Sequence, residues 1–161
     1  MTGVAFFLLC AVPAFAQIDE ISAKIEKSSC VPCFSAARVA LQQLSGVESA
    51  EADHGSGTVR VRVKERQGVS MKEVIERIKM AAAGSEIEKI ELSAVGQVET
   101  RGNRDVLVIP HQNETFLIDA QERKNMVDNL AKNEQKSRVR GTLTVAGNEY
   151  RVKVSLLQRA D

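Results

Sequence analysis

The hydrophobic pattern near the N-terminus changes from a strand-like period to a helix-like one. In ISAKIEK, residues 21–27, the apolar residues Ile21, Ala23 and Ile25 alternate with polar ones, as in a β-strand with one buried face. Apolar residues then recur at the spacing of one helix face, at Ala37, Ala40, Leu41 and Leu44. Ser45-Gly46 is a typical helix end. A strand followed by a helix is therefore predicted.

The next segment repeats this strand and helix content. ESAEAD (48–53) and TVRVRVK (58–64) read as two strands joined by the glycine-rich turn HGSG. Ser70 and Glu73 form a capping box before an apolar stripe at helical spacing, and EIEKIEL (86–92) reads as a fourth strand. The order β-α-β-β-α-β predicts an α+β, ferredoxin-like domain over residues 17–94, with both helices on one face of an antiparallel sheet.

Residues 95–161 follow a different order. AVGQVETR, DVLVIPHQ and ETFLIDA read as three short strands, and RVRGTLTV and EYRVKVSLL as a closing hairpin. Between them, Asp119 and Glu122 form a capping box before a helix. One face of this helix is expected to hold Met126, Val127, Leu130 and Ala131. Three strands, a helix and two strands predict a small, OB-like β-barrel domain.

The first sixteen residues, MTGVAFFLLCAVPAFA, carry no charge and form an apolar run too short to span a membrane. The run ends in Ala14-Phe15-Ala16, a small-x-small pattern typical of signal peptidase cleavage. We expect residues 1–16 to be a signal peptide that carries Cys10 away with it. The mature chain would begin at Gln17, be periplasmic or secreted, and have no stable membrane insertion.

The composition argues against two classes of function. The net charge is +1 and aromatic residues make up 4% of the chain, which does not favour a nucleic-acid partner. The sequence contains no recognisable Ser-His-Asp set, phosphate-binding loop or paired-carboxylate site, so we do not expect an enzyme. A monomer is expected.

The remaining chemistry lies in the pair Cys30 and Cys33, placed where the first helix begins. The positive end of a helix dipole stabilises thiolate, the form that binds soft metals. Two sulfurs satisfy Cu(I) or Hg(II), whereas Zn(II) needs two further ligands. The same C-x-x-C also fits a thiol-disulfide oxidoreductase, or a passive disulfide in a metal-free binding module. His54 and His111 are left out of the site because lone turn histidines are usually solvated.

The layout from about Ile18 to Leu92 resembles the heavy-metal-associated domain family, found in copper chaperones and the periplasmic mercury-binding protein. The matching pieces are C-V-P-C after the first strand, LQQLSGV, TVRVRV and the second amphipathic helix. The family usually has Gly-Met-Thr where this chain has Lys27, Ser28 and Ser29. The resemblance implies a βαββαβ fold whose two cysteines bind one soft metal ion, Cu(I) favoured, with Hg(II) or Zn(II) as alternatives. It also implies a metal-donor or metal-acceptor protein as partner.

Overall fold

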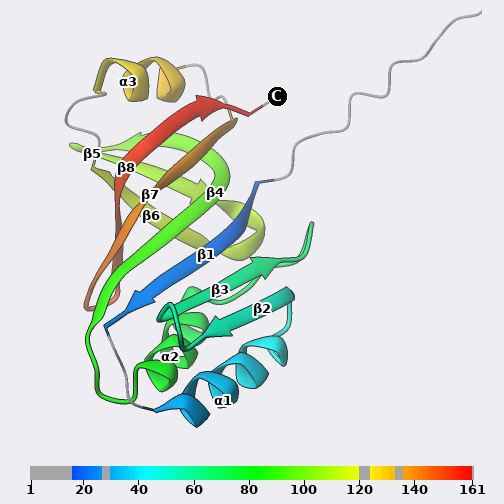
Figure 1. Cartoon of the computed structure of the whole chain (residues 1–161). Helices are drawn as coiled ribbons and strands as arrows, with labels where there is room; N and C mark the ends of the chain where they lie inside the picture. Colours follow the sequence, from blue (N-terminus) through cyan, green and yellow to red (C-terminus); the bar gives the residue numbers. More distant parts are fainter. Residues whose placement is uncertain (1–15, 27–29, 120–123, 133–135, 161) are drawn as a thin grey trace, which may run out of the picture.

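The computed structural model describes residues 16–26, 30–119, 124–132 and 136–160, and shows an α+β fold (Figure 1). The helices are α1 (Val31–Gln42), α2 (Met71–Ala82) and α3 (Lys124–Lys132), with a short 3₁₀ turn η1 (Pro110–Gln112). The strands are β1 (Gln17–Ile25), β2 (Val47–Asp53), β3 (Thr58–Val63), β4 (Ile87–Arg101), β5 (Arg104–Ile109), β6 (Glu114–Asp119), β7 (Lys136–Ala146) and β8 (Glu149–Arg159).

The N-terminal half of the chain forms one wing of the sheet. Its strands lie in the order β2-β3-β1-β4, and each neighbouring pair is antiparallel. Helices α1 and α2 lie side by side on one face of this wing (Figure 1). The helix cap expected at Ser70 is present: Ser70 Oγ accepts the N–H of Glu73 at 3.3 Å at the start of α2.

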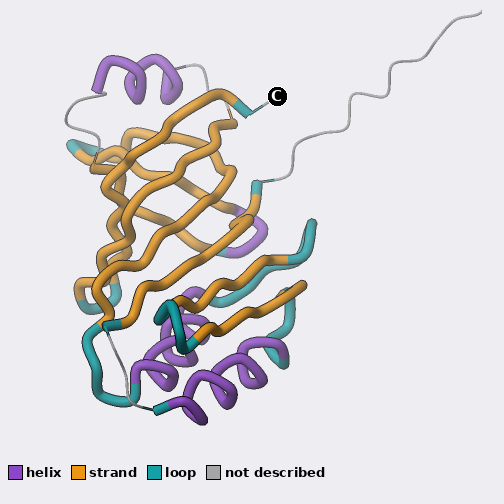
Figure 2. The backbone as a smooth tube through the Cα atoms, viewed as in Figure 1, coloured by secondary structure: helices purple, strands orange, loops and turns teal. Residues whose placement is uncertain are grey.

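The C-terminal half closes into a small barrel. Its strands follow the order β4-β5-β6-β8-β7, and β7 pairs back onto β4 to close the ring (Figure 2). The β6–β8 pair is parallel and the other barrel pairs are antiparallel. The small barrel expected from the sequence is therefore confirmed. Helix α3 connects β6 to β7 and contacts β4.

Strand β4 belongs to both parts. Its residues 87–95 pair with β1, its residues 97–101 pair with β5, and its other edge pairs with β7 from Ile90 to Gln97. The sequence led us to expect two strands, one ending at Leu92 and another beginning near Ala94. The structure has a single strand there, and the expected boundary between residues 94 and 95 lies within it. Whether the two halves fold independently stays a prediction.

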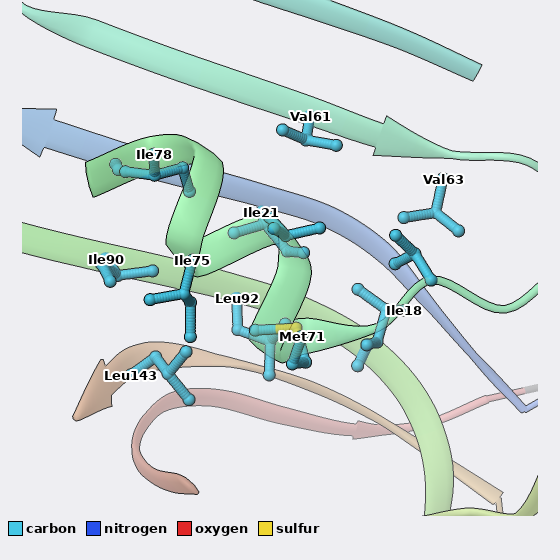
Figure 3. Packing of buried hydrophobic residues seen from close by; sticks show 14 of the residues in the cluster. Ile18, Ile21, Val61, Val63, Met71, Ile75, Ile78, Ile90, Leu92 and Leu143 are labelled. Atoms are coloured by element: carbon cyan, nitrogen blue, oxygen red, sulfur yellow. The ribbon is translucent and has the colours of Figure 1, made fainter. Parts of the chain in front are cut away.

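The buried face of each early element agrees with the hydrophobic pattern. Ile21, Ala23 and Ile25 are at most 1% exposed, and Met71 of α2 is fully buried, as a core residue should be. Figure 3 shows Met71 and Ile75 of α2 pointing toward Leu92 of β4 and Leu143 of β7. The apolar core therefore continues from the helices into the barrel strands, and each fully buried aliphatic side chain contributes about 1.5–3 kcal/mol.

Two expectations around α3 and one at the N-terminus have different outcomes. Val127 and Leu130 are buried as expected, but Met126 is 42% exposed, so its placement on the buried face was wrong. The helix turns Val127 and Leu130 onto the barrel, and residue 126 then lies at the edge of that face. The expected cap at Glu122 lies outside the described residues, as does the expected signal peptide except for Ala16.

The barrel also contacts the loop before α2. Glu114 of β6 accepts the backbone N–H of Met71 through Oε1 at 3.0 Å. Gln112 of η1 donates through Nε2 to the carbonyl oxygen of Gln67 at 3.2 Å. These two polar contacts link the wing to the barrel, in addition to the strand β4 and the apolar core that the two parts share.

Candidate cysteine site

The two cysteines stand at the start of α1, as the sequence predicted. Cys30 is the N-cap residue, and the backbone N–H of Cys33 donates to the carbonyl oxygen of Cys30 at 3.1 Å. Pro32 lies in the first turn, where its missing N–H leaves no helix hydrogen bond unmade. The first turn contains no acidic residue that would offset the positive end of the helix dipole at the sulfurs.

In the structure, Cys30 and Cys33 form a disulfide, with their Cα atoms 5.3 Å apart. Both residues are half-buried, and Val31 between them is 55% exposed. The pair therefore lies at the surface, where a small reductant, a metal ion or a partner's thiol can reach it. Of the residues that precede it, Lys27, Ser28 and Ser29 lie outside the described part of the chain.

His54 lies closer to this site than the sequence indicated. Its ring packs edge-on against the ring of Phe34, with centroids 5.4 Å apart, and Phe34 directly follows Cys33. Phe34 is 2% exposed and anchors the first turn of α1 in the core. The β2–β3 turn that carries His54 is thus positioned beside the helix start, a long-range contact that no local sequence pattern signals.

The β2–β3 turn is held by Asp53. Its carboxylate accepts the backbone N–H groups of Gly55 at 2.9 Å and Ser56 at 3.3 Å. The Ser56 side chain, followed by the Gly55 N–H, lowers the pKa of Asp53, and the charge of His54 adds a smaller effect in the same direction. Lys24 of β1 also donates to the Ser56 carbonyl oxygen, which ties the turn to the end of β1.

The loop after α2 meets the same end of the wing. Ala83 ends α2 in the left-handed conformation, with φ at 48°. The backbone N–H of Glu26, just after β1, donates to the carbonyl oxygen of Glu86 at 3.0 Å. The α2–β4 loop is thus joined to the end of β1, after which the chain continues toward the cysteine pair.

The ligand set at this end is the cysteine pair. Among the residues that the structure describes, no group of three or more His, Cys, Asp or Glu side chains is arranged to hold a metal ion. Reduced to thiolates, Cys30 and Cys33 would offer two soft ligands, which is the number that Cu(I) or Hg(II) accepts. His111, in η1, is exposed and lines a small pocket beside Gln112, where no cysteine contributes.

No protein-family model, curated protein or solved structure matches the chain. No helix within the described ranges has the length and apolar character needed to cross a membrane.

Proposed function

We propose that this chain binds one soft metal ion, Cu(I) in preference to Hg(II) or Zn(II), through Cys30 and Cys33 and delivers it to a partner protein. The observation that carries the proposal is the position of both sulfurs together at an accessible helix N-terminus. The helix dipole there favours thiolate, and the spacing lets both sulfurs converge on one ion.

Transfer would proceed by ligand exchange. A dithiol or other reductant first supplies two electrons and two protons, which open the disulfide to two thiols. Each thiol releases its proton when its sulfur binds the ion. A two-coordinate ion at the surface accepts an incoming thiolate of the partner before one of its own sulfurs leaves, so the ion is never free. The oxidation state of the ion does not change.

We also propose the finer assignments that accompany this function. The wing would be a ferredoxin-like, heavy-metal-associated module, supported by its strand order β2-β3-β1-β4 and its two helices on one face. The barrel would be OB-like, supported by three strands, a helix and two strands that close on themselves. A periplasmic or secreted location is supported by the apolar leader pattern and agrees with a disulfide.

The test is an anaerobic Cu(I) titration of the reduced protein against a competing chelator. We expect one Cu(I) per chain in the wild type. Cys30→Ser and Cys33→Ser should each abolish stoichiometric binding, because a protonated hydroxyl is a poor ligand for a soft ion. Ser35→Ala, at an exposed position of the same helix, is the matched control and should bind like the wild type. A reduced wild type that never outcompetes a chelator of modest affinity contradicts the proposal.

The disulfide itself favours a second candidate, thiol-disulfide exchange. In this reaction, a substrate thiolate attacks one sulfur, the Cys30–Cys33 bond breaks, and the other cysteine leaves as thiolate. A second substrate thiolate then resolves the mixed disulfide, so that the substrate is oxidised and this protein is reduced. Rapid exchange with small thiols together with an oxidising potential would favour this candidate over metal transfer.

A passive disulfide would show neither behaviour. Its loss would lower stability by at most about 2 kcal/mol, because the closed loop is very short. Urea melts of the oxidised and reduced wild type measure this loss. Together with the Cu(I) titration and the rate of thiol exchange, they distinguish a passive disulfide from metal transfer and from thiol-disulfide exchange.

A further inference from the structure

A polar groove of about 610 Å³ lies on the sheet, lined by side chains from β1, β2, β3, β4, β7 and β8. Its β1 residues Glu20 and Ser22 alternate with the core residues Ile21 and Ala23, so they project from the face that the helices do not cover. Neither Cys30 nor Cys33 lines it. The groove is therefore separate from the cysteine site.

Three β-bulges supply residues to this groove. The β1–β4 register skips Asp19, the β2–β3 register skips Glu48, and the β7–β8 register skips Ser155. Each skipped residue lines the groove. A bulge inserts one residue into a strand and re-aims a side chain that regular alternation would place elsewhere. Three bulges that direct side chains into one groove indicate a ligand-binding surface.

The groove contains charges of both signs, most of which are paired. Arg62 Nε lies 3.5 Å from a Glu20 carboxylate oxygen, and Arg138 Nε lies 3.7 Å from an Asp19 carboxylate oxygen. The Arg138 Nε atom is nevertheless buried and makes no hydrogen bond within the described part of the chain. The Arg138 side chain as a whole is 42% exposed, so atoms of it other than Nε remain accessible to an acceptor supplied from outside.

One charge of each sign is left over toward the two ends of the groove, Glu48 on β2 at one end and Arg140 on β7, next to the last lining strand β8, at the other. Arg140 contacts the hydroxyl of Ser93 through Nε at 3.3 Å, and no carboxylate among the described residues lies within ion-pair distance of it. Glu48, on β2, likewise has no cationic partner among the described residues. A ligand that is negative at one end and positive at the other would match both.

The separation of these ends sets the size of the ligand. Arg140 pairs across to Ser93, Ser93 to Glu20, and Glu20 to Arg62, whose strand is next to β2. Four strand spacings at about 4.8 Å each give roughly 19 Å. A single amino acid is too short to reach both ends, whereas an extended peptide of about six residues spans this distance.

We propose that the groove binds a short peptide, with its C-terminal carboxylate held by Arg138 and Arg140 and its N-terminal amine at Glu48. The guanidinium groups would donate charge-assisted hydrogen bonds to the carboxylate. The hydroxyls of half-buried Ser93 and exposed Ser155 line the same groove; the Ser93 hydroxyl, which accepts from Arg140, can still donate to the peptide's backbone, and the Ser155 hydroxyl, which donates to the Arg140 carbonyl oxygen, can still accept from it. This inference goes beyond metal binding and does not depend on it.

The test is an NMR titration of the full protein with a hexapeptide of alternating glycine and serine that has both ends free. We expect saturable chemical-shift changes at groove residues. Amidation of the peptide's C-terminus should weaken binding about tenfold or more, because it removes the charged acceptor. Arg140→Gln should have a similar effect on the free peptide, and Glu48→Gln should weaken it less.

The controls isolate the carboxylate contact. Arg159→Gln, an exposed arginine of β8 outside the groove, should bind like the wild type. The amidated peptide should bind Arg140→Gln and wild type equally, since the lost interaction is the same one. The amidated peptide on wild type tests the proposal even if a variant fails to fold.

Three results would overturn the proposal. The first is an absence of saturable shifts at groove residues at millimolar peptide. The second is equal affinity for the free and amidated peptides. The third is inorganic phosphate or acetate binding at Arg140 as tightly as the peptide does, which would reduce the groove to a site for any small anion.

Discussion

At the scale of single residues, Glu114 joins the two parts of the molecule. It lies on β6, yet its carboxylate accepts the N–H of Met71, the first residue of α2. Helix α2 is thus capped by its own Ser70 and also by a residue of the barrel. Helix N-terminal N–H groups need such partners when they are half-buried, and an unsatisfied one costs about 1–3 kcal/mol.

Burial raises the pKa of Glu114, and the Met71 N–H opposes this only in part. Because the folded pKa lies above the unfolded one, the stabilising effect of this group is present at low pH and is lost as pH rises through the folded pKa. Glu114→Gln keeps the acceptor without the charge. We expect its free energy of unfolding at pH 7 to match or slightly exceed that of the wild type, by less than about 1 kcal/mol because solvent screens the half-exposed carboxylate, with a weaker pH dependence.

The measurement is a series of urea melts from pH 4 to pH 7 on the wild type, Glu114→Gln and Glu114→Ala. The alanine variant is the control, because it leaves the Met71 N–H unpaired and should lose about 1–2 kcal/mol at pH 7. A glutamine variant as unstable as the alanine variant at pH 7 would show that the carboxylate charge stabilises the helix end more than its burial costs.

Some of the residues that shape the site and the contacts between the two parts can be predicted from the sequence, and others cannot. Cys30 and Cys33 are identifiable because their spacing and their position at a helix start are local features. The contacts of His54 with Phe34 and of Glu114 with Met71 join distant segments, and nothing in their neighbourhood in the sequence distinguishes them. The groove is hidden for a related reason, since Asp19, Glu48 and Ser155 look like ordinary polar strand residues until the register is known.

At the scale of elements, β4 is the strand for which the sequence pattern predicted two separate strands. Ala94, Val95 and Gly96 are all buried, so the alternation that marks a strand disappears at these three positions. There the strand passes from the wing into the barrel and is covered on both faces. Loss of alternation through burial resembles a break in a strand, whereas a strand such as β3, whose buried and exposed residues alternate, is recognisable from its pattern.

Gly96 is the residue at which β4 changes partners, since β1 pairs up to Val95 and β5 begins at Gln97. A Cβ atom at Gly96 would lie 2.6 Å from the Val108 carbonyl oxygen and 2.8 Å from Leu107 Cδ1. We expect Gly96→Ala to lower the free energy of unfolding by about 1–3 kcal/mol through overpacking. Equilibrium urea unfolding measures this.

The control for this prediction is Gln97→Ala in the same strand, whose half-buried side chain has no such backbone crowding. It should change stability by less than about 1 kcal/mol. If Gly96→Ala is as stable as Gln97→Ala, the β4–β5 pair can separate without loss, and the strand junction is looser than its packing indicates.

At the scale of the whole molecule, the wing and the barrel share a strand and a core. The change of hydrophobic pattern along the sequence predicted two parts, because each has its own order of strands and helices. The sequence could not reveal that the two parts are joined through one strand, because the shared strand follows the hydrophobic pattern of the wing first and that of the barrel afterwards. The cut between residues 94 and 95 leaves β1 nearly all of its β4 partners, but it removes Ile90 to Ala94 from β7.

This asymmetry leads to a prediction about fragments. Residues 17–94 retain both helices and almost the entire β1–β4 pairing, so we expect this fragment to fold and to melt cooperatively. Residues 95–161 lose five of the eight β4–β7 pairs and the buried side chains of Ile90 and Leu92, so they should not close a barrel. Residues 87–161 restore the whole of β4 and should regain strand structure.

Circular dichroism and urea melts of the three fragments test this directly. Fragment 87–161 is the matched control for fragment 95–161, because the two differ only in the first part of β4. A stable fragment 95–161 would mean that β5 to β8 supply enough core by themselves and that the sharing of β4 contributes little. Disorder in fragment 17–94 would mean instead that α2 needs the barrel, through the Glu114 contact and the packing of Met71 against the barrel strands.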